Sequence, residues 1–137
     1  MERKTKSKNY IEPMPRGQFL RLMKDFKAAG GKYIANAESE KFLDAQGAEA
    51  STLNATTILF RKKPTRAAVY EELYHINQFR SGKIDGTARN AYECEAEAKA
   101  YLLENAEAFQ LTEAEINQTK EALIWYQKKL KTMKGDA

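Results

Sequence analysis

The only histidine of this 137-residue chain, His75, follows Glu71 by four positions, and Glu72 stands between them. Residues four apart on a helix project from the same face, so Glu71 and His75 can reach one metal ion, and Gln78 continues their stripe. Glu72 falls beside the apolar stripe of this helix, where partial desolvation raises the pKa of a carboxyl group toward the range of a general base. The pattern therefore predicts two metal ligands and a proton acceptor on one helix.

The spacing matches that of the zinc-peptidase helix, in which two ligands four residues apart bind the metal and a glutamate between them activates water. Here Glu71 takes the position of the first histidine. A carboxylate oxygen selects zinc less strongly than an imidazole nitrogen does, so zinc or another divalent ion is compatible with the pattern. An ordinary amphipathic helix with one half-exposed histidine has the same spacing, and other segments must decide between the two interpretations.

A second acidic group lies on a later helix, expected at residues 87–109. Measured from the centre of its apolar face, Glu95 lies nearest, Glu97 farther away and Glu93 farthest. Glu95 is therefore predicted to point inward, and an inward carboxylate needs a cation or hydrogen-bond donors to offset its desolvation. Glu93 is predicted to be solvated surface.

Hydrophobic periodicity and helix-capping residues predict the elements that position these groups. We expect helices at residues 17–29, 39–47, 65–81, 87–109 and 112–133, and strands at residues 32–35 and 51–60. Thr65 is predicted as the N-cap of the helix that carries His75, and Thr112 with Glu115 as a capping box. Together these elements predict a small α+β domain, rich in helix, with a small sheet beside the His75 helix.

The composition is that of one globular domain, with 42% hydrophobic and 31% charged residues and a net charge of +4. No apolar run reaches the length of a membrane span, and the first residues lack the apolar stretch of a signal peptide. The single Cys94 excludes an internal disulfide, and a single histidine excludes a paired Glu-x-x-His di-metal site. Residues 1–15, basic and containing Pro13 and Pro15, are expected to form a flexible segment before a domain at residues 16–137.

Several segments of the chain occur in a recognisable order. They are TILFRKKPT at residues 57–65, EELYH at 71–75 with Gln78, EAEA at 95–98 and LLENA at 102–106. Through them, residues 17–132 resemble the zincin-like metallopeptidase toxin domains of bacterial polymorphic and contact-dependent growth inhibition toxins. The resemblance implies a zincin-like fold.

The same resemblance assigns roles to individual residues. It implies that Glu71 and His75 are the metal ligands of the helix, that Glu72 activates water, and that Glu95, or alternatively Glu97, is the third ligand. Zinc would polarise a scissile carbonyl and lower the pKa of bound water, while Glu72 takes the proton. A neighbouring strand edge can bind an extended peptide, and Gln78 and Tyr74 are expected to contact this substrate.

The resemblance also implies a biological setting. The domain would be a secreted or delivered effector, acting as a zinc-dependent hydrolase, most simply a peptidase, on a protein or peptide in the cytoplasm of a competing cell, where a cognate immunity protein neutralises it. Two alternatives stay open: a ribonuclease toxin that uses His75 without a metal and holds phosphates with basic residues, and a non-catalytic binding module on a zincin scaffold.

Overall fold

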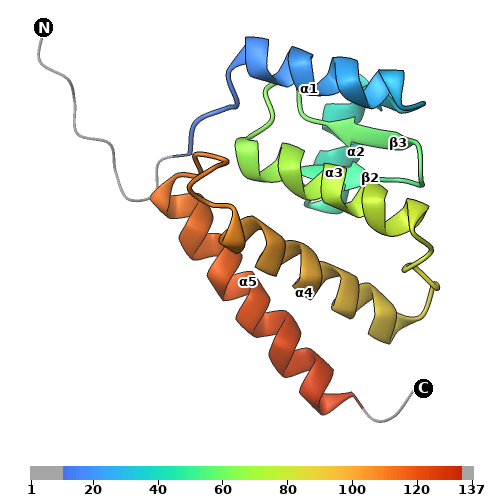
Figure 1. Cartoon of the computed structure of the whole chain (residues 1–137), viewed down its shortest axis with the longest axis vertical. Helices are drawn as coiled ribbons and strands as arrows, with labels where there is room; N and C mark the ends of the chain where they lie inside the picture. The colour runs from blue at the N-terminus through green and yellow to red at the C-terminus, as the bar shows by residue number, and fades with distance from the viewer. Residues whose placement is uncertain (1–10, 134–137) are drawn as a thin grey trace, which may run out of the picture.

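The structure, a computed structural model that describes residues 11–133, is a small α+β domain (Figure 1). Its elements follow in the order α1 (Arg16–Ala28), β1 (Lys32–Ile34), α2 (Ala37–Gln46), β2 (Ala50–Thr52), β3 (Thr57–Phe60), α3 (Arg66–Arg80), α4 (Ala88–Glu104) and α5 (Glu113–Thr132). Helix α3 lies between α1 and the sheet on one side and the pair formed by α4 and α5 on the other. The fold class predicted from the sequence is confirmed.

The three strands form a mixed sheet in the order β1-β3-β2. Strand β1 pairs with β3 in parallel, and β2 pairs with β3 in antiparallel register, with Ser51 opposite Leu59. All four residues of β3 are buried, which is why this strand is a continuous run of apolar and β-branched residues. Strand β2 is left at an edge of the sheet.

The single strand expected at residues 51–60 is in fact two strands. Asn54 turns the chain between them, because its side-chain oxygen accepts hydrogen bonds from the backbone N–H groups of Thr56 (2.9 Å) and Thr57 (3.0 Å). Such short polar side chains offer the backbone local partners and favour turns. The turn creates the edge strand β2 and directs it past α3.

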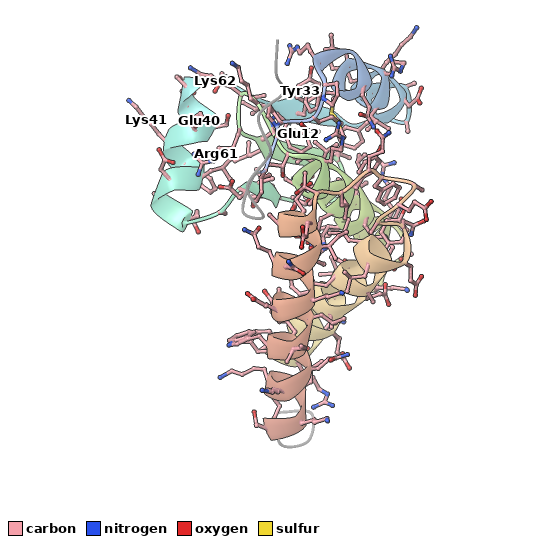
Figure 2. All side chains as sticks on the ribbon, turned by 90° about the vertical axis from the view of Figure 1, so that its left-hand side faces the viewer. Glu12, Tyr33, Glu40, Lys41, Arg61 and Lys62 are labelled. Atoms are coloured by element: carbon pink, nitrogen blue, oxygen red, sulfur yellow. The ribbon has the colours of Figure 1, made fainter. Side chains whose placement is uncertain are left out.

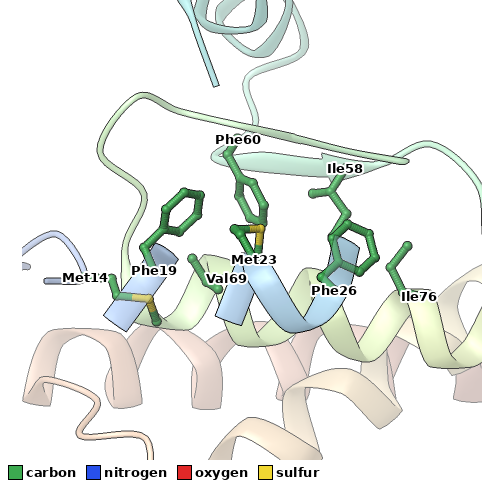
Figure 3. Packing of buried hydrophobic residues seen from close by; sticks show 8 residues of the cluster. All are labelled: Met14, Phe19, Met23, Phe26, Ile58, Phe60, Val69 and Ile76. Atoms are coloured by element: carbon green, nitrogen blue, oxygen red, sulfur yellow. The ribbon is translucent and has the colours of Figure 1, made fainter. Parts of the chain in front are cut away.

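The hydrophobic core fills the space between α1, β3 and α3 (Figure 3). Phe19 of α1 meets Phe60 of β3 edge to face, with ring centroids 5.4 Å apart. The other buried members of this cluster are Met14, Met23, Phe26, Ile58, Val69 and Ile76. Because the apolar face of α3 is used here, the face that carries His75 is turned toward α4.

Helix α3 begins as the sequence predicts, since the Thr65 side chain accepts a hydrogen bond from the N–H of Ala68. The capping box of α5 is also confirmed, with Thr112 and Glu115 accepting each other's backbone N–H. The second carboxylate oxygen of Glu115 accepts the N–H of Ala67 at 2.9 Å. One buried glutamate thus fixes the N-terminal ends of α3 and α5 against each other.

Two predicted helix boundaries are wrong. Helix α2 starts after Asn36 rather than Ser39, and Ser39 completes the reciprocal capping and donates to the carbonyl of Phe60 at 2.9 Å. Helix α4 ends at Glu104, not near Phe109, whose ring instead stacks on Tyr70 with centroids 3.8 Å apart. Tertiary contacts override the helical periodicity at this end.

The C-terminal end of β3 is tied to α2 by charged groups, as Figure 2 shows for Glu40 and Arg61. The Arg61 guanidinium lies 3.1 Å from Glu40 and donates to the carbonyl of Ala48 at 2.9 Å. The N–H of Lys62 donates to the other Glu40 oxygen at 2.8 Å. Arg61 is therefore a structural residue whose charge is balanced within the domain.

The segment expected to be flexible is described from residue 11 onward, and this part is packed. Met14 is a core residue, and its N–H donates to the carbonyl of Pro64 at 2.8 Å. Glu12 forms an ion pair of 2.6 Å with Arg66 of α3. The domain therefore begins before residue 16, while residues 1–10 lie outside the described part of the chain.

Replacement of Met14 by alanine tests whether this segment belongs to the domain. Met14→Ala should lower the free energy of unfolding by about 2 to 3 kcal/mol, because it leaves a cavity at a side chain that is only 5% exposed. Leu20→Ala, at a 44% exposed position of α1, is the control and should cost less than about 0.5 kcal/mol. Equal values for both variants in urea denaturation would show that residues 11–15 do not stabilise the domain.

Candidate metal centre

The site lies where the second face of α3 meets α4, and its centre is the imidazole of His75. The Gln78 amide donates to the carbonyl of Cys94 (3.0 Å) and to Glu97 (3.2 Å), so its oxygen is left to accept a hydrogen bond. This oxygen lies 2.7 Å from Nδ1 of His75, which must therefore carry the proton. The other ring nitrogen, Nε2, is left for the carboxylates of the site or for a metal.

Two carboxylates face this nitrogen. Glu95 Oε1 lies 3.2 Å and Glu71 Oε2 lies 3.9 Å from Nε2 of His75. Ligands at about 2.1 Å from a tetrahedral zinc are about 3.4 Å apart, a value between these two distances. One potential ligand atom each from Glu71, Glu72 and His75 lies within 4.8 Å of the others, so these residues could hold a metal ion. Carboxylates and an imidazole are ligands that a divalent ion accepts, but Glu95 is not a member of this group of three.

A lysine that was not predicted from the sequence also belongs to this site. Lys99 Nζ lies 2.5 Å from Glu71 Oε1 and 3.5 Å from Glu95 Oε1, and its side chain is only 14% exposed. Burial alone would lower the pKa of Lys99, but the charges of Glu71 and Glu95 raise it above its ordinary value. The inward Glu95 thus has a cation from its own chain, which the sequence argument for a metal did not include.

Glu72 has the protonation behaviour that its helix position predicts. Burial, and then the charge of Glu71, raise the pKa of Glu72 to about 7, against the lowering effects of His75 and Thr52. The hydroxyl of Thr52, on the edge strand β2, donates to Glu72 Oε1 at 3.0 Å. A carboxyl group that exchanges protons near neutral pH is suited to act as a general base.

His75 is charged in the metal-free site. Burial lowers its pKa, but the hydrogen bond that Nε2–H donates to Glu95 and the charges of Glu72 and Glu95 outweigh burial and raise the pKa to about 9. Desolvation raises the pKa of Glu95, but His75 and Lys99 outweigh it and hold this pKa below its usual value. Binding of a metal at Nε2 would release the proton, as expected when ligands must be deprotonated.

Glu97, the alternative third ligand, lies in a different network. It accepts hydrogen bonds from the Tyr74 hydroxyl (2.8 Å) and from Gln78, and it forms an ion pair of 3.0 Å with Lys83. Its carboxylate is satisfied there, whereas the Glu95 carboxylate faces His75. Of Glu95 and Glu97, only Glu95 contacts His75, so Glu95 is the better candidate of the two for a third ligand.

The substrate contacts expected of Gln78 and Tyr74 do not match their positions. Gln78 is 2% exposed and orients the His75 ring from behind. Tyr74 stacks on Tyr101 with centroids 4.3 Å apart and donates to Glu97. Neither side chain lines the cavity described next.

A cavity of about 640 Å³ opens beside the site and has the size of a small-molecule or peptide pocket. Strand β2 forms one wall, and residues of α3, α4 and α5 form the others. Its charged lining is dominated by carboxylates: Glu49, Glu71, Glu72, Glu95 and Glu115, against Lys99 and His75. A cavity of this charge attracts cations and disfavours phosphate groups.

Comparison of the chain with protein-family models, with curated proteins and with solved structures found no match. The resemblance to toxin domains therefore stays a prediction. Over residues 11–133, no helix is both long enough and apolar enough to cross a bilayer.

Replacement of Glu72 by glutamine tests the burial of its charge. Its folded pKa of about 7 lies above the ordinary value of 4.5, so the metal-free protein should lose stability as pH rises through this window. Glu72→Gln keeps the size of the side chain and does not titrate. The free energy of unfolding of Glu72→Gln, relative to that of the parent, should therefore be higher at pH 7.5 than at pH 4.5, by on the order of 2 kcal/mol.

The measurement is urea denaturation of both proteins at the two pH values, with a chelator present. Glu104→Gln, at an exposed position of α4, serves as the control and should show no such difference. A constant stability difference between Glu72→Gln and the parent would mean that folding does not raise the pKa of Glu72.

Proposed function

We propose that the domain is a metal-dependent hydrolase that binds one divalent ion, most simply zinc, through Glu71, His75 and Glu95. The observation that carries this proposal is the arrangement of two carboxylate oxygens at 3.2 and 3.9 Å from Nε2 of His75, at the wall of a cavity. Glu72 is the general base. Its pKa is about 7 in the metal-free site, and a bound divalent ion would lower this pKa, so that Glu72 is ionised and can take a proton from water.

The protein residues divide the chemistry among them. A bound zinc ion supplies a Lewis acid that lowers the pKa of water and polarises a carbonyl. Gln78 holds the His75 ring so that Nε2 faces the ligand carboxylates. The Thr52 hydroxyl donates a hydrogen bond to Oε1 of Glu72, which leaves Oε2 of Glu72 to accept the proton.

A peptide is the substrate class that the surroundings of the site support. Within residues 11–133, strand β2 pairs with β3 along one side only, and it forms a wall of the cavity. An extended peptide can add to such an edge through main-chain hydrogen bonds, which would place its carbonyl groups beside Glu72. The acidic lining of the cavity argues against RNA, because phosphates would be repelled, and residues 61–63 are absent from the lining.

The setting proposed for this activity is that of a toxin domain delivered into the cytoplasm of a competing bacterium, with an immunity protein as its partner. The resemblance of residues 57–65, 71–78 and 95–106 to such domains supports it. Expression of the domain should therefore stop growth, and a product of an adjacent gene should restore it.

Single substitutions separate the ligands from the base. Glu71→Gln, His75→Gln and Glu95→Gln should each lower the affinity for zinc by more than about tenfold, because each removes a charged or imidazole ligand. Glu72→Gln should keep the metal and lower activity by a factor on the order of 10² to 10⁴. Metal content is measured in the purified proteins, and activity as peptide cleavage and growth arrest.

Glu97→Gln is the matched control and should leave zinc binding unchanged. Loss of zinc in Glu97→Gln with retention in Glu95→Gln would move the third ligand to Glu97. A parent protein that binds no stoichiometric metal, together with an equally toxic Glu72→Gln variant, would refute the mechanism, and cleavage of RNA would then be assayed.

A further inference from the structure

The two oxygens of Glu71 have different partners. Oε2 lies 3.9 Å from Nε2 of His75, whereas Oε1 lies 2.5 Å from Nζ of Lys99. Both side chains of the Glu71–Lys99 pair are largely buried, at 17% and 14% exposure. One oxygen of Glu71 is thus directed to the proposed metal position while the other is held from behind.

Lys99 is itself held in place by two elements. It lies four residues after Glu95 on α4, and its ammonium group is 3.5 Å from Glu95 Oε1. From α5, the ring of Tyr126 lies against it, with the ammonium 5.9 Å from the ring centroid. The lysine therefore contacts both carboxylates predicted to bind the metal.

The chemistry of position 71 explains why a lysine is needed here. A histidine ligand has a second N–H, which metal sites normally direct to a carboxylate or carbonyl acceptor. A carboxylate ligand has no N–H and requires a donor instead. With Glu71 in place of a histidine, the residue that holds the ligand must therefore be a hydrogen-bond donor instead of an acceptor. Lys99 is such a donor.

We infer that Lys99 is the positioning residue of Glu71, and that Glu71 and Lys99 together replace a histidine ligand and its acceptor. This inference rests on the proposed metal site. The charges are consistent with it, because a divalent ion and Lys99 balance the three carboxylates of Glu71, Glu72 and Glu95 around a neutral His75. Lys99 holds the Glu71 carboxylate in one orientation before the ion arrives.

The alternative is that Lys99 takes the place of a metal ion. The two roles predict opposite changes in metal affinity when Lys99 is replaced. For a positioning residue, Lys99→Met should weaken zinc and cobalt binding by about 10- to 100-fold, as loss of such partners does in other metal sites. For a competing cation, the same change should strengthen binding. Lys99→Arg keeps a donor and should retain most of the affinity. Lys83→Met, at a half-exposed lysine paired with Glu97, is the control and should leave affinity unchanged.

Exchanging the donor and the acceptor between positions 71 and 99 tests this inference directly. Glu71→His alone sets the N–H of an imidazole against the Lys99 ammonium and should bind metal weakly. The double variant Glu71→His with Lys99→Glu supplies an acceptor and should regain at least tenfold in affinity over Glu71→His. Its cobalt complex should also absorb at a different wavelength from that of the parent, because a nitrogen replaces an oxygen ligand.

The experiment is competition with a chelator for zinc and cobalt on the whole chain, with circular dichroism to check folding. Affinity of Lys99→Met within twofold of the parent, or tighter, would overturn the inference while leaving the proposed function intact. A parent protein that binds no metal would overturn both. If Lys99→Met does not fold, the comparison of Glu71→His with the double variant decides, and failure to regain affinity overturns the inference.

Discussion

The constraint on which the structure depends is the burial of charged groups on one face of α3. The other face of this helix packs into the core between α1 and the sheet, so its orientation is fixed. Glu72 and His75 are thereby buried and Glu71 is half-buried, so water solvates all three poorly. Buried charges destabilise a fold unless partners compensate them, and an arrangement of this kind in a cavity indicates a functional site. The compensation comes from Lys99 on α4 and from Thr52 on the edge strand.

Much of this arrangement could be predicted because it depends on local sequence. The N-cap at Thr65 and the capping box at Thr112 are set by residues three positions apart, and both form as expected. The inward direction of Glu95 follows from its angular distance to the apolar face of one helix, and its contact with His75 agrees with it. The raised pKa of Glu72 follows in the same way from its place beside the apolar stripe.

The features that sequence reasoning missed depend on contacts between distant segments. A lysine on a mostly polar helix is usually solvated, and only the packing of α3 against α4 brings Lys99 to Glu71. The spacing of Lys99 four residues after Glu95 was a usable signal, because it places both on one stripe. Met14 lies in a proline-rich segment without periodicity, so its place in the core comes from pairing with the Pro64 carbonyl. The edge strand β2 likewise depends on the turn at Asn54, inside what seemed one strand.

In the proposed function, the edge strand β2 would connect substrate binding to the chemistry of the site. The single hydroxyl proton of Thr52 can reach either the backbone carbonyl of Glu72, at 3.1 Å, or its carboxylate, at 3.0 Å. When it donates to the carboxylate it lowers the pKa of Glu72, and when it donates to the carbonyl that effect is lost. A peptide added to the free side of β2 would fix the strand against α3 and so select one of the two hydrogen bonds. The same strand would then align the substrate and set the basicity of the group that acts on it.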